Sequence, residues 1–364
     1  MNLSTGIVGL PNVGKSTLFN AITNSTVEAA NYPFATIEPN VGIVNVPDKR
    51  MKVLTSMIEP DSVVYTTFKF VDIAGLVKGA SKGEGLGNKF LQNIREVDSI
   101  CHVVRCFDND DITHVHNSVD PIRDVEVINL ELILADLDVL NNRIEKIAKK
   151  AQSGNKESIK EKEICDRLIN HLTNNKLANT LGLTEEEKLI IKSYNLLTLK
   201  PMLYVANIDE NDITTYESNK HYQALKNLVG EKNIIALSVK IEYEISQLDE
   251  ASKEEFIKEL NLSSSGLDKL IFSSYKLLNL STFFTYGKKE VRAWTFVNGM
   301  FAPECAGIIH TDFQRGFIKA EIIKYDDLVA LKSEQAVKDA GKLKLAGKDY
   351  IMQDGDICNF KFNV

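Results

Sequence analysis

The segment that most restricts how this 364-residue chain can fold is Gly9-Leu-Pro-Asn-Val-Gly-Lys-Ser16, which fits the pattern G-x-x-x-x-G-K-[ST]. A strand-like run, Gly6–Leu10, leads into it, and an apolar helical stretch, Thr17–Ile22, follows it. Glycines let backbone N–H groups curl around phosphate oxygens, and the helix N-terminus adds partial positive charge. This context predicts a phosphate-binding loop in an α/β fold, with Lys15 reaching the β- and γ-phosphates and the Ser16 hydroxyl binding Mg²⁺. The expected nucleotide contacts of the loop are Asn12, Val13, Gly14, Lys15, Ser16 and Thr17.

Composition excludes several classes of protein. The formal net charge of −7 argues against a protein that coats nucleic acid. No apolar run reaches 18 residues, and Gly6–Leu10 follows the start too closely for a signal peptide. We therefore expect no membrane span and a cytoplasmic protein. The cysteines form no C-x-x-C pair, so we expect reduced thiols and no disulfide or zinc framework: Cys101, Cys106, Cys165, Cys305 and Cys358.

The chain up to residue 129 alternates short apolar runs with helical stretches and glycine-rich turns. This alternation predicts a doubly wound, mostly parallel sheet with helices on both faces. We assign residues 1–129 and 201–279 to this nucleotide-binding domain. The expected strands are Gly6–Leu10, Thr67–Val71, Ser99–Phe107, Met202–Ala206 and Ile234–Ser238.

The pattern changes at Leu130, where apolar residues begin to recur in steps of three and four along one helical face up to Ile147. We interpret residues 130–200 as a helical hairpin inserted between two strands of the first domain. The alternative is that these helices simply cover the sheet. The expected elements are a turn at Gln152–Asn155, a helix at Ser158–Thr173, and a helix from a capping box at Thr184 and Glu187 up to Leu199.

The last part of the chain, residues 280–364, mixes short strand-like runs with one helical stretch. Such a mixture within about 80 residues suggests a small α+β module. The expected elements are strands Val291–Val297 and Phe317–Ile323, a helix over Asp326–Ala340, and a closing strand-like pattern over Lys348–Phe360.

A second motif, Asp72-Ile-Ala-Gly75, closes the second apolar strand. The Asp72 carboxylate is therefore expected at the carboxyl edge of the sheet, where it would hold Mg²⁺ through water. The Gly75 N–H could donate to the γ-phosphate. The glycine-rich stretch that follows suits a loop that orders with the γ-phosphate, although a flexible surface loop is the alternative. Thr36 is the candidate for completing the Mg²⁺ shell.

The stretch Asn207-Ile-Asp-Glu210 follows a buried strand, where GTPases carry Asn-Lys-x-Asp. Guanine offers two adjacent donors to an aspartate, whereas adenine offers a donor beside an acceptor. Glu210 is one methylene longer than aspartate, and Ile208 cannot supply the stem of a lysine. Loss of the paired hydrogen-bond geometry weakens guanine selectivity without establishing adenine.

Together these motifs resemble the YchF subfamily of Obg-related P-loop proteins, the Obg-like ATPases. The likeness runs from about residue 5 to the C-terminus. It implies a P-loop domain, a helical (coiled-coil) insertion and a C-terminal TGS domain of β-grasp fold. It also implies hydrolysis of ATP in preference to GTP and an association with ribosomes. The residues that carry it are Gly9–Thr17, Asn31–Phe34 with Thr36, Asp72–Ala80, Asn207–Glu210 and Gly347–Ile357.

The resemblance also implies roles for residues around the base. Asn207 would tie its loop to the phosphate loop, Ile208 would meet adenine by side chain and backbone, and Glu210 would make a looser contact. Ser238, in Ser238-Val-Lys240, is the candidate for the remaining base-side loop. Asn12 resembles a position from which some related enzymes bind K⁺, and bracing of the loop is the alternative.

Activation of water needs a group that the motif itself lacks. Leu76 stands where many GTPases place the glutamine that orients water. His114 lies in the polar stretch after Ser99–Phe107, and strand ends of this fold open onto the nucleotide crevice. An imidazole there could orient water or donate to a phosphate oxygen. The alternative is that His114 and His116 are surface residues; the resemblance favours His114, since the proposed substitute for glutamine in this subfamily is a loop histidine.

The distribution of charge along the chain does not by itself identify a binding partner. Residues 143–176 carry nine basic and five acidic residues, which fits contact with ribosomal RNA or a solvated hairpin. Residues 281–364 carry twelve basic and eleven acidic residues, which is no RNA signature. We expect a monomeric, Mg²⁺-dependent ATPase whose nucleotide state sets its grip on ribosomes. An Obg-class GTPase of ribosome assembly and a module that holds ATP with negligible turnover remain open alternatives.

Overall fold

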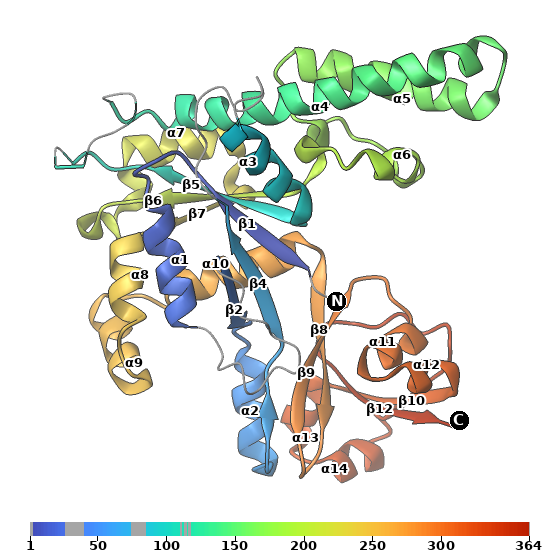
Figure 1. Cartoon of the computed structure of the whole chain (residues 1–364). Coiled ribbons are helices and arrows are strands. Elements are labelled where there is room, and N and C mark those ends of the chain that lie inside the picture. Colours follow the sequence, from blue (N-terminus) through green and yellow to red (C-terminus); the bar gives the residue numbers. More distant parts are fainter. Residues whose placement is uncertain are drawn as a thin grey trace.

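A six-stranded sheet forms the centre of the larger part of the protein (Figure 1). The computed structural model describes residues 3–25, 40–73, 85–109, 111–112, 115 and 118–363. The sheet is parallel except for β2, which pairs antiparallel with β4 at one edge. In sheet order the strands are β2 (Val41–Asn45), β4 (Thr67–Asp72), β1 (Ser4–Val8), β5 (Ser99–Arg105), β6 (Met202–Asn207) and β7 (Ile234–Leu237).

The doubly wound sheet predicted from the sequence is confirmed. Every residue of β1, β5 and β6 is buried, because helices cover both faces of the sheet, and most of these residues are apolar. In Figure 1 one face carries α3 (Gly85–Glu96), α4 (Pro121–Gln152) and α7 (Lys220–Val229). The other face carries α1 (Lys15–Asn24), α8 (Val239–Ile245) and α10 (Gly266–Leu277), with α9 (Glu250–Glu259) beside α8.

The inserted hairpin consists of α4 and α5 (Lys156–Thr173) and projects beyond the sheet (Figure 1). Helix α4 begins at Pro121, not at Leu130. Val125 and Ile128 in its first turns already pack into the hydrophobic core around the sheet. Its later turns pack against α5. The structure therefore places the predicted boundary at 130 inside one continuous helix.

The segment that follows the hairpin, up to Leu199, contains less α-helix than predicted. The capping box at Thr184 and Glu187 is confirmed, but α6 ends at Ile191, and two 3-10 turns replace the expected continuation to Leu199. Asp136 of α4 anchors this segment: its buried carboxylate accepts from the N–H groups of Leu197 and Thr198, both at 2.8 Å. Burial raises the pKa of this carboxyl above its usual range.

The C-terminal module is a mixed sheet with short helices, in agreement with the predicted β-grasp fold. Strand β12 pairs antiparallel with β10 and parallel with β8. The single helix predicted over Asp326–Ala340 is wrong: Lys332 has a left-handed φ of 64° and separates two helices. The elements are β8 (Leu280–Tyr286), β9 (Val291–Val297), α11 (Ala302–Ile309), α12 (Thr311–Arg315), β10 (Phe317–Lys324), α13 (Tyr325–Leu331), α14 (Glu334–Asp339), β11 (Lys344–Ala346) and β12 (Asp356–Phe362).

A segment that the sequence did not reveal joins the two parts. Between β2 and β4 the chain leaves the nucleotide sheet, forms α2 (Lys49–Ile58), and adds β3 (Val63–Val64) to the edge of the C-terminal sheet. In Figure 1 this blue segment lies beside the orange strands of the C-terminal module.

Two further expectations concern cysteines and membranes. All five cysteines are free and buried, and burial raises the pKa of the Cys101 thiol to about 12. Across the described residues, no helix combines the length and the apolar character that crossing a membrane requires.

Candidate nucleotide site

The phosphate loop lies between β1 and α1, as its motif predicted. Asn12 and Gly14 adopt left-handed backbone conformations, with φ of 64° and 98°. A Cβ on Gly14 would lie 2.5 Å from Asn207 Nδ2, and one on Gly9 would lie 2.8 Å from Val103 O. Glycine is therefore required at both positions. Val13 is buried, whereas Asn12, Ser16 and Thr17 are exposed and can face a ligand.

Lys15 and Asp72 form an ion pair beside this loop. Lys15 is the first residue of α1, and Asp72 is the last residue of β4, the strand next to β1. Their side chains are only 11% and 18% exposed. A strand end thus places a carboxylate directly against the lysine that the motif assigned to phosphates.

The donors near Asp72 suit a hard divalent cation. Asp72 supplies carboxylate oxygen, and Ser16 supplies an exposed hydroxyl on the first turn of the adjoining helix. Among the described residues, no group of three or more His, Cys, Asp or Glu side chains could hold a metal ion. Mg²⁺ commonly takes one or two protein carboxylates and completes its shell with water and substrate phosphates. The donor set therefore fits Mg²⁺ and does not fit a closed zinc site.

Asn207, the last residue of β6, joins three segments of the site. Its Nδ2 donates to Val13 O at 2.9 Å, and its Oδ1 accepts from Val239 N at 3.1 Å. The side chain is buried. Asn207 therefore connects its own loop both to the phosphate loop, as expected, and to the start of α8.

Ile208, the residue after β6, is buried. Its side chain is only 2% exposed, and its N–H donates to Leu237 O at 3.0 Å. The residue lines a cavity of about 280 Å³ with Tyr216, Tyr222 and Ser238. Ile208 therefore packs beside β7 and lines this cavity, and its contact with a base stays a prediction.

Glu210 and Lys240 close the outer end of this region. Glu210 follows β6, Lys240 lies in the first turn of α8, and their charged groups are 2.7 Å apart. The hydrogen bond that Lys240 donates to Glu210 raises the pKa of Lys240 above its ordinary value. In this structure Glu210 thus pairs with the Ser238-Val-Lys240 segment, in which Ser238 itself is buried, and the looser contact of Glu210 with a base stays a prediction.

Arg105 is a buried residue that the sequence did not single out. Its guanidinium is 1% exposed and donates to three carbonyls of the loop after β5: Phe107 O at 3.0 Å, Ile112 O at 2.9 Å and Asn109 O at 2.9 Å. It also lies over the Phe107 ring at 4.7 Å. Arg105 therefore fixes the described part of the loop whose sequence leads to His114.

Three of the predicted site residues are not among those that the structure describes. Thr36, Gly75 and His114 lie outside the described residues, as does His116. The described site thus brings together Lys15, Asp72 and Asn207 at the phosphate loop. Glu210, Ser238 and Lys240 gather at the ends of β6 and β7.

Comparison with protein families gives two matches in different parts of the chain. Residues 4–135 match the family described as 50S ribosome-binding GTPase. Residues 280–363 match the C-terminal domain of YchF GTPases, a family described as a protein of unknown function. The second match begins at the first residue of β8.

Individual relatives extend the likeness to the whole chain. The chain is 53% identical to the ribosome-binding ATPase YchF of Bacillus subtilis and 50% identical to that of Escherichia coli O157:H7, with both chains of each pair fully covered. Its structure resembles the YchF GTPase of Schizosaccharomyces pombe with a TM-score of 0.89 and 41% identity, covering 99% of this chain and 98% of the other. A GTP-binding protein of Pyrococcus horikoshii shares the fold, with a TM-score of 0.60 and 21% identity over 99% of this chain and 100% of the other.

Proposed function

The chain belongs to the YchF family of P-loop nucleoside triphosphatases, and from that premise we propose a Mg²⁺-dependent ATPase whose nucleotide state controls its binding to ribosomes. The observation that carries the proposal is the meeting of Lys15 and Asp72 at a phosphate loop braced by Asn207. This arrangement supplies a cation for phosphate oxygens and a carboxylate for a metal ion in adjacent positions.

Residues of this chain would take the following roles in hydrolysis. Binding of a metal–triphosphate would exchange the ion pair, so that Lys15 holds phosphate oxygens while Asp72 holds the metal through water. Ser16 and Thr36 would supply the further oxygen ligands, and the Gly75 N–H would donate to the γ-phosphate. Bound Mg²⁺ neutralises the charge that develops between the β- and γ-phosphates.

Water activation falls to His114 in this proposal. Arg105 supports it by fixing the described start of the loop that carries His114. Since Leu76 stands in the place of a water-orienting glutamine, unassisted turnover should be slow.

A monovalent cation is the remaining candidate cofactor. Asn12 is exposed at the phosphate loop, from which it could contribute to a K⁺ site beside the phosphates. Hydrolysis rates in KCl and NaCl at matched ionic strength test this role: faster hydrolysis in KCl supports it, and equal rates leave Asn12 as a brace of the loop.

Adenine is the proposed base. The names of the relatives do not agree on the nucleotide, since the curated bacterial relatives are called ATPases and the S. pombe structure is called a GTPase. Support comes from the absence of the aspartate and lysine that read guanine, and from a lysine, Lys240, that engages Glu210. A carboxylate bound to an ammonium group is less free to accept both adjacent donors of guanine.

Ribosome binding is proposed from the names of the bacterial relatives and from the charge of the hairpin. Its distal end carries exposed Lys146, Lys149, Lys150 and Lys156. Basic side chains clustered at the end of a projecting hairpin can contact the phosphates of ribosomal RNA. A ribosome-bound protein of this kind would act in the cytoplasm, and we propose that it does so as a monomer.

Two measurements on the full chain test the function. A phosphate-release time course with Mg²⁺–ATP should show turnover that a chelator abolishes; absence of turnover would favour a module that only holds ATP. Co-sedimentation with ribosomes should differ between non-hydrolysable ATP and ADP. Lys149→Glu with Lys150→Glu should weaken it, whereas the matched exposed pair Lys288→Glu with Lys289→Glu should not. Equal co-sedimentation in both nucleotides would contradict nucleotide control.

A further inference from the structure

Residues 46–66 leave the nucleotide sheet and become part of the C-terminal module's core. Met51 and Leu54 of α2 are fully buried in the same cluster as Phe284, Val291 and Leu328 of that module. Strand β3 pairs parallel with β9, and Val291 N donates to Ser62 O at 3.0 Å. This segment therefore completes one of the two buried clusters of the C-terminal module, while the other consists of the module's own residues.

Both ends of the same segment return to the nucleotide site. A hydrogen bond from Val46 N to Thr66 O, at 2.8 Å, closes its neck. Beyond the neck, β2 and β4 pair residue by residue up to Val41 and Val71. The next residue, Asp72, donates its N–H to Asn40 O at 2.8 Å while its carboxylate holds Lys15. The strand pair that carries the segment is thus the one that positions the candidate metal ligand.

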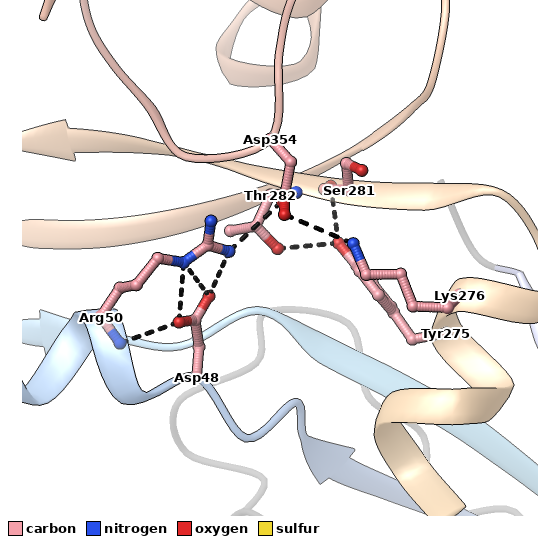
Figure 2. Close-up of polar contacts among 7 residues, drawn as sticks. All are labelled: Asp48, Arg50, Tyr275, Lys276, Ser281, Thr282 and Asp354. Atoms are coloured by element: carbon pink, nitrogen blue, oxygen red, sulfur yellow. Dashed lines mark hydrogen bonds and ion pairs between the residues drawn. The ribbon is translucent and has the colours of Figure 1, made fainter. Parts of the chain in front are cut away.

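A polar cluster fastens the segment to the last loop of the chain (Figure 2). Asp48 caps α2 and holds Arg50 by two short bonds, Nε to Oδ1 at 2.9 Å and Nη2 to Oδ2 at 2.7 Å. The same Nη2 donates to Asp354 Oδ1 at 3.3 Å. Lys276 of α10 reaches Asp354 Oδ2 at 3.4 Å, and Thr282 N donates to Asp354 Oδ1 at 2.9 Å. The Asp354 carboxylate therefore binds the cationic side chains of two helices, Arg50 of α2 and Lys276 of α10.

The backbone of this loop passes close to the guanidinium of Arg50 at Gly355. Gly355 has a φ of 87°, and a Cβ on it would lie 2.9 Å from Arg50 Nη1. The guanidinium also lies over the Phe284 ring at 5.0 Å. Burial by itself raises the pKa of Asp354, but the bond from Thr282 and the charges of Arg50 and Lys276 outweigh it and hold the pKa below its usual range.

We infer that residues 46–66, fastened by the Arg50–Asp354 contact, couple the occupancy of the nucleotide site to the docking of the C-terminal module. A displacement of β4 and β2 when Asp72 exchanges Lys15 for a metal must move α2 or loosen its contact with Asp354. Because such coupling is reciprocal, weakening that contact should also change the ratio of the affinities for the two nucleotides. The inference rests on the proposed function.

The test measures the affinities of the full chain for ADP and for a non-hydrolysable ATP analogue. Asp354→Asn keeps the acceptor for Thr282 N and removes the charge, and Arg50→Met removes the partner. Each should change the ratio of the two affinities at least threefold, and the double variant should change it no further than a single one. Lys52→Met is the control, because Lys52 lies exposed on the same helix and its ammonium group pairs with exposed Glu254 of α9 at 3.4 Å, away from Asp354.

Unchanged ratios in both variants would overturn the inference. Hydrogen exchange of the unmodified chain provides a second measurement that does not depend on how the variants fold. Amides of residues 46–66 and 350–358 should exchange at different rates with the ATP analogue and with ADP, and equal rates would likewise overturn it. If the unmodified chain binds neither nucleotide, the proposed function fails together with this inference.

Discussion

The side chain of Asn207 joins the phosphate loop to the first turn of α8, donating to Val13 O at 2.9 Å and accepting from Val239 N at 3.1 Å. Both the donor and the acceptor of this one buried amide are used. A close approach at Gly14 completes the arrangement, since any side chain there would collide with Asn207 Nδ2. The base region and the phosphate region are therefore held as one unit.

Removal of that amide should damage both stability and binding. Asn207→Ala leaves Val13 O and Val239 N without their partner, which should lower the free energy of unfolding by about 1–3 kcal/mol. Affinity for ATP should fall at least tenfold. Denaturant unfolding and nucleotide titration measure the two effects, with Asn211→Ala as control because its exposed amide bonds only to Asp209. Parent-like affinity in Asn207→Ala would contradict the bracing role.

The Glu210–Lys240 ion pair offers a direct test of base choice. As a surface ion pair it would contribute little to stability, and exchanging the two charges would restore it. If instead the carboxylate and the ammonium group contact the base, the exchange would put a donor where the base needs an acceptor and the reverse. Recognition of the base should then be lost. We expect Glu210→Lys with Lys240→Glu to lower the ratio of ATP to GTP affinity at least fivefold and to remain folded. A parent-like ratio would show that the pair does not read the base.

A pH effect on stability should come from His102. The side chain lies in β5 at 1% exposure, its Nδ1 has no hydrogen-bond partner among the described residues, and burial lowers its pKa to about 3. In the unfolded chain His102 takes up a proton near pH 6.5, whereas in the folded chain it does so only near pH 3. The contribution of the neutral, buried imidazole to the free energy of unfolding is therefore complete above pH 6.5. It should fall by about 1.4 kcal/mol per unit of acidification between pH 6.5 and pH 3.

Denaturant unfolding at several pH values measures this contribution. His102→Leu should become more stable relative to the parent as the pH falls from 7 to 5. Val103→Ala, at the next buried position of the strand, should lower stability by a similar amount at every pH. A constant difference between parent and His102→Leu would contradict the assignment.

Catalysis should depend on His114. His114→Ala should reduce the turnover number at least tenfold, which is about 1.4 kcal/mol in the barrier, and leave ATP affinity within a few-fold. His116→Ala should have a much smaller effect. Single-turnover phosphate release measures both. If His114→Ala hydrolyses ATP at the parent rate, hydrolysis must come from Lys15, Mg²⁺ and backbone groups, or from a partner acting in trans.

The elements that the sequence predicted well are those whose local pattern has one physical solution. Parallel strands covered on both faces are mostly apolar, so β1, β5 and β6 were visible as short apolar runs. The capping box at Thr184 is equally local. The C-terminal end of α6 and the break at Lys332 were missed, because the left-handed residues Asn195, which follows the turn after α6, and Lys332 carry no strong sequence signal.

Long-range placement was harder to predict. Met51 and Leu54 mark an apolar helix face, but nothing local indicates that this face packs on residues more than two hundred positions away. Arg105 was missed for a similar reason, since its partners are carbonyls and leave no trace in the sequence. At the site, the motifs located Lys15, Asp72 and Asn207, whereas the burial of Ile208 depended on packing against β7.

The most direct test of the account is a comparison of ATP and GTP affinities for the unmodified chain, measured by titration in the presence of Mg²⁺. The absence of an aspartate at position 210 and the engagement of Glu210 by Lys240 both weaken guanine recognition. We therefore expect ATP to bind at least tenfold more tightly than GTP, a difference of about 1.4 kcal/mol. Equal affinities, or tighter binding of GTP, would contradict the assignment of adenine and favour an Obg-class GTPase.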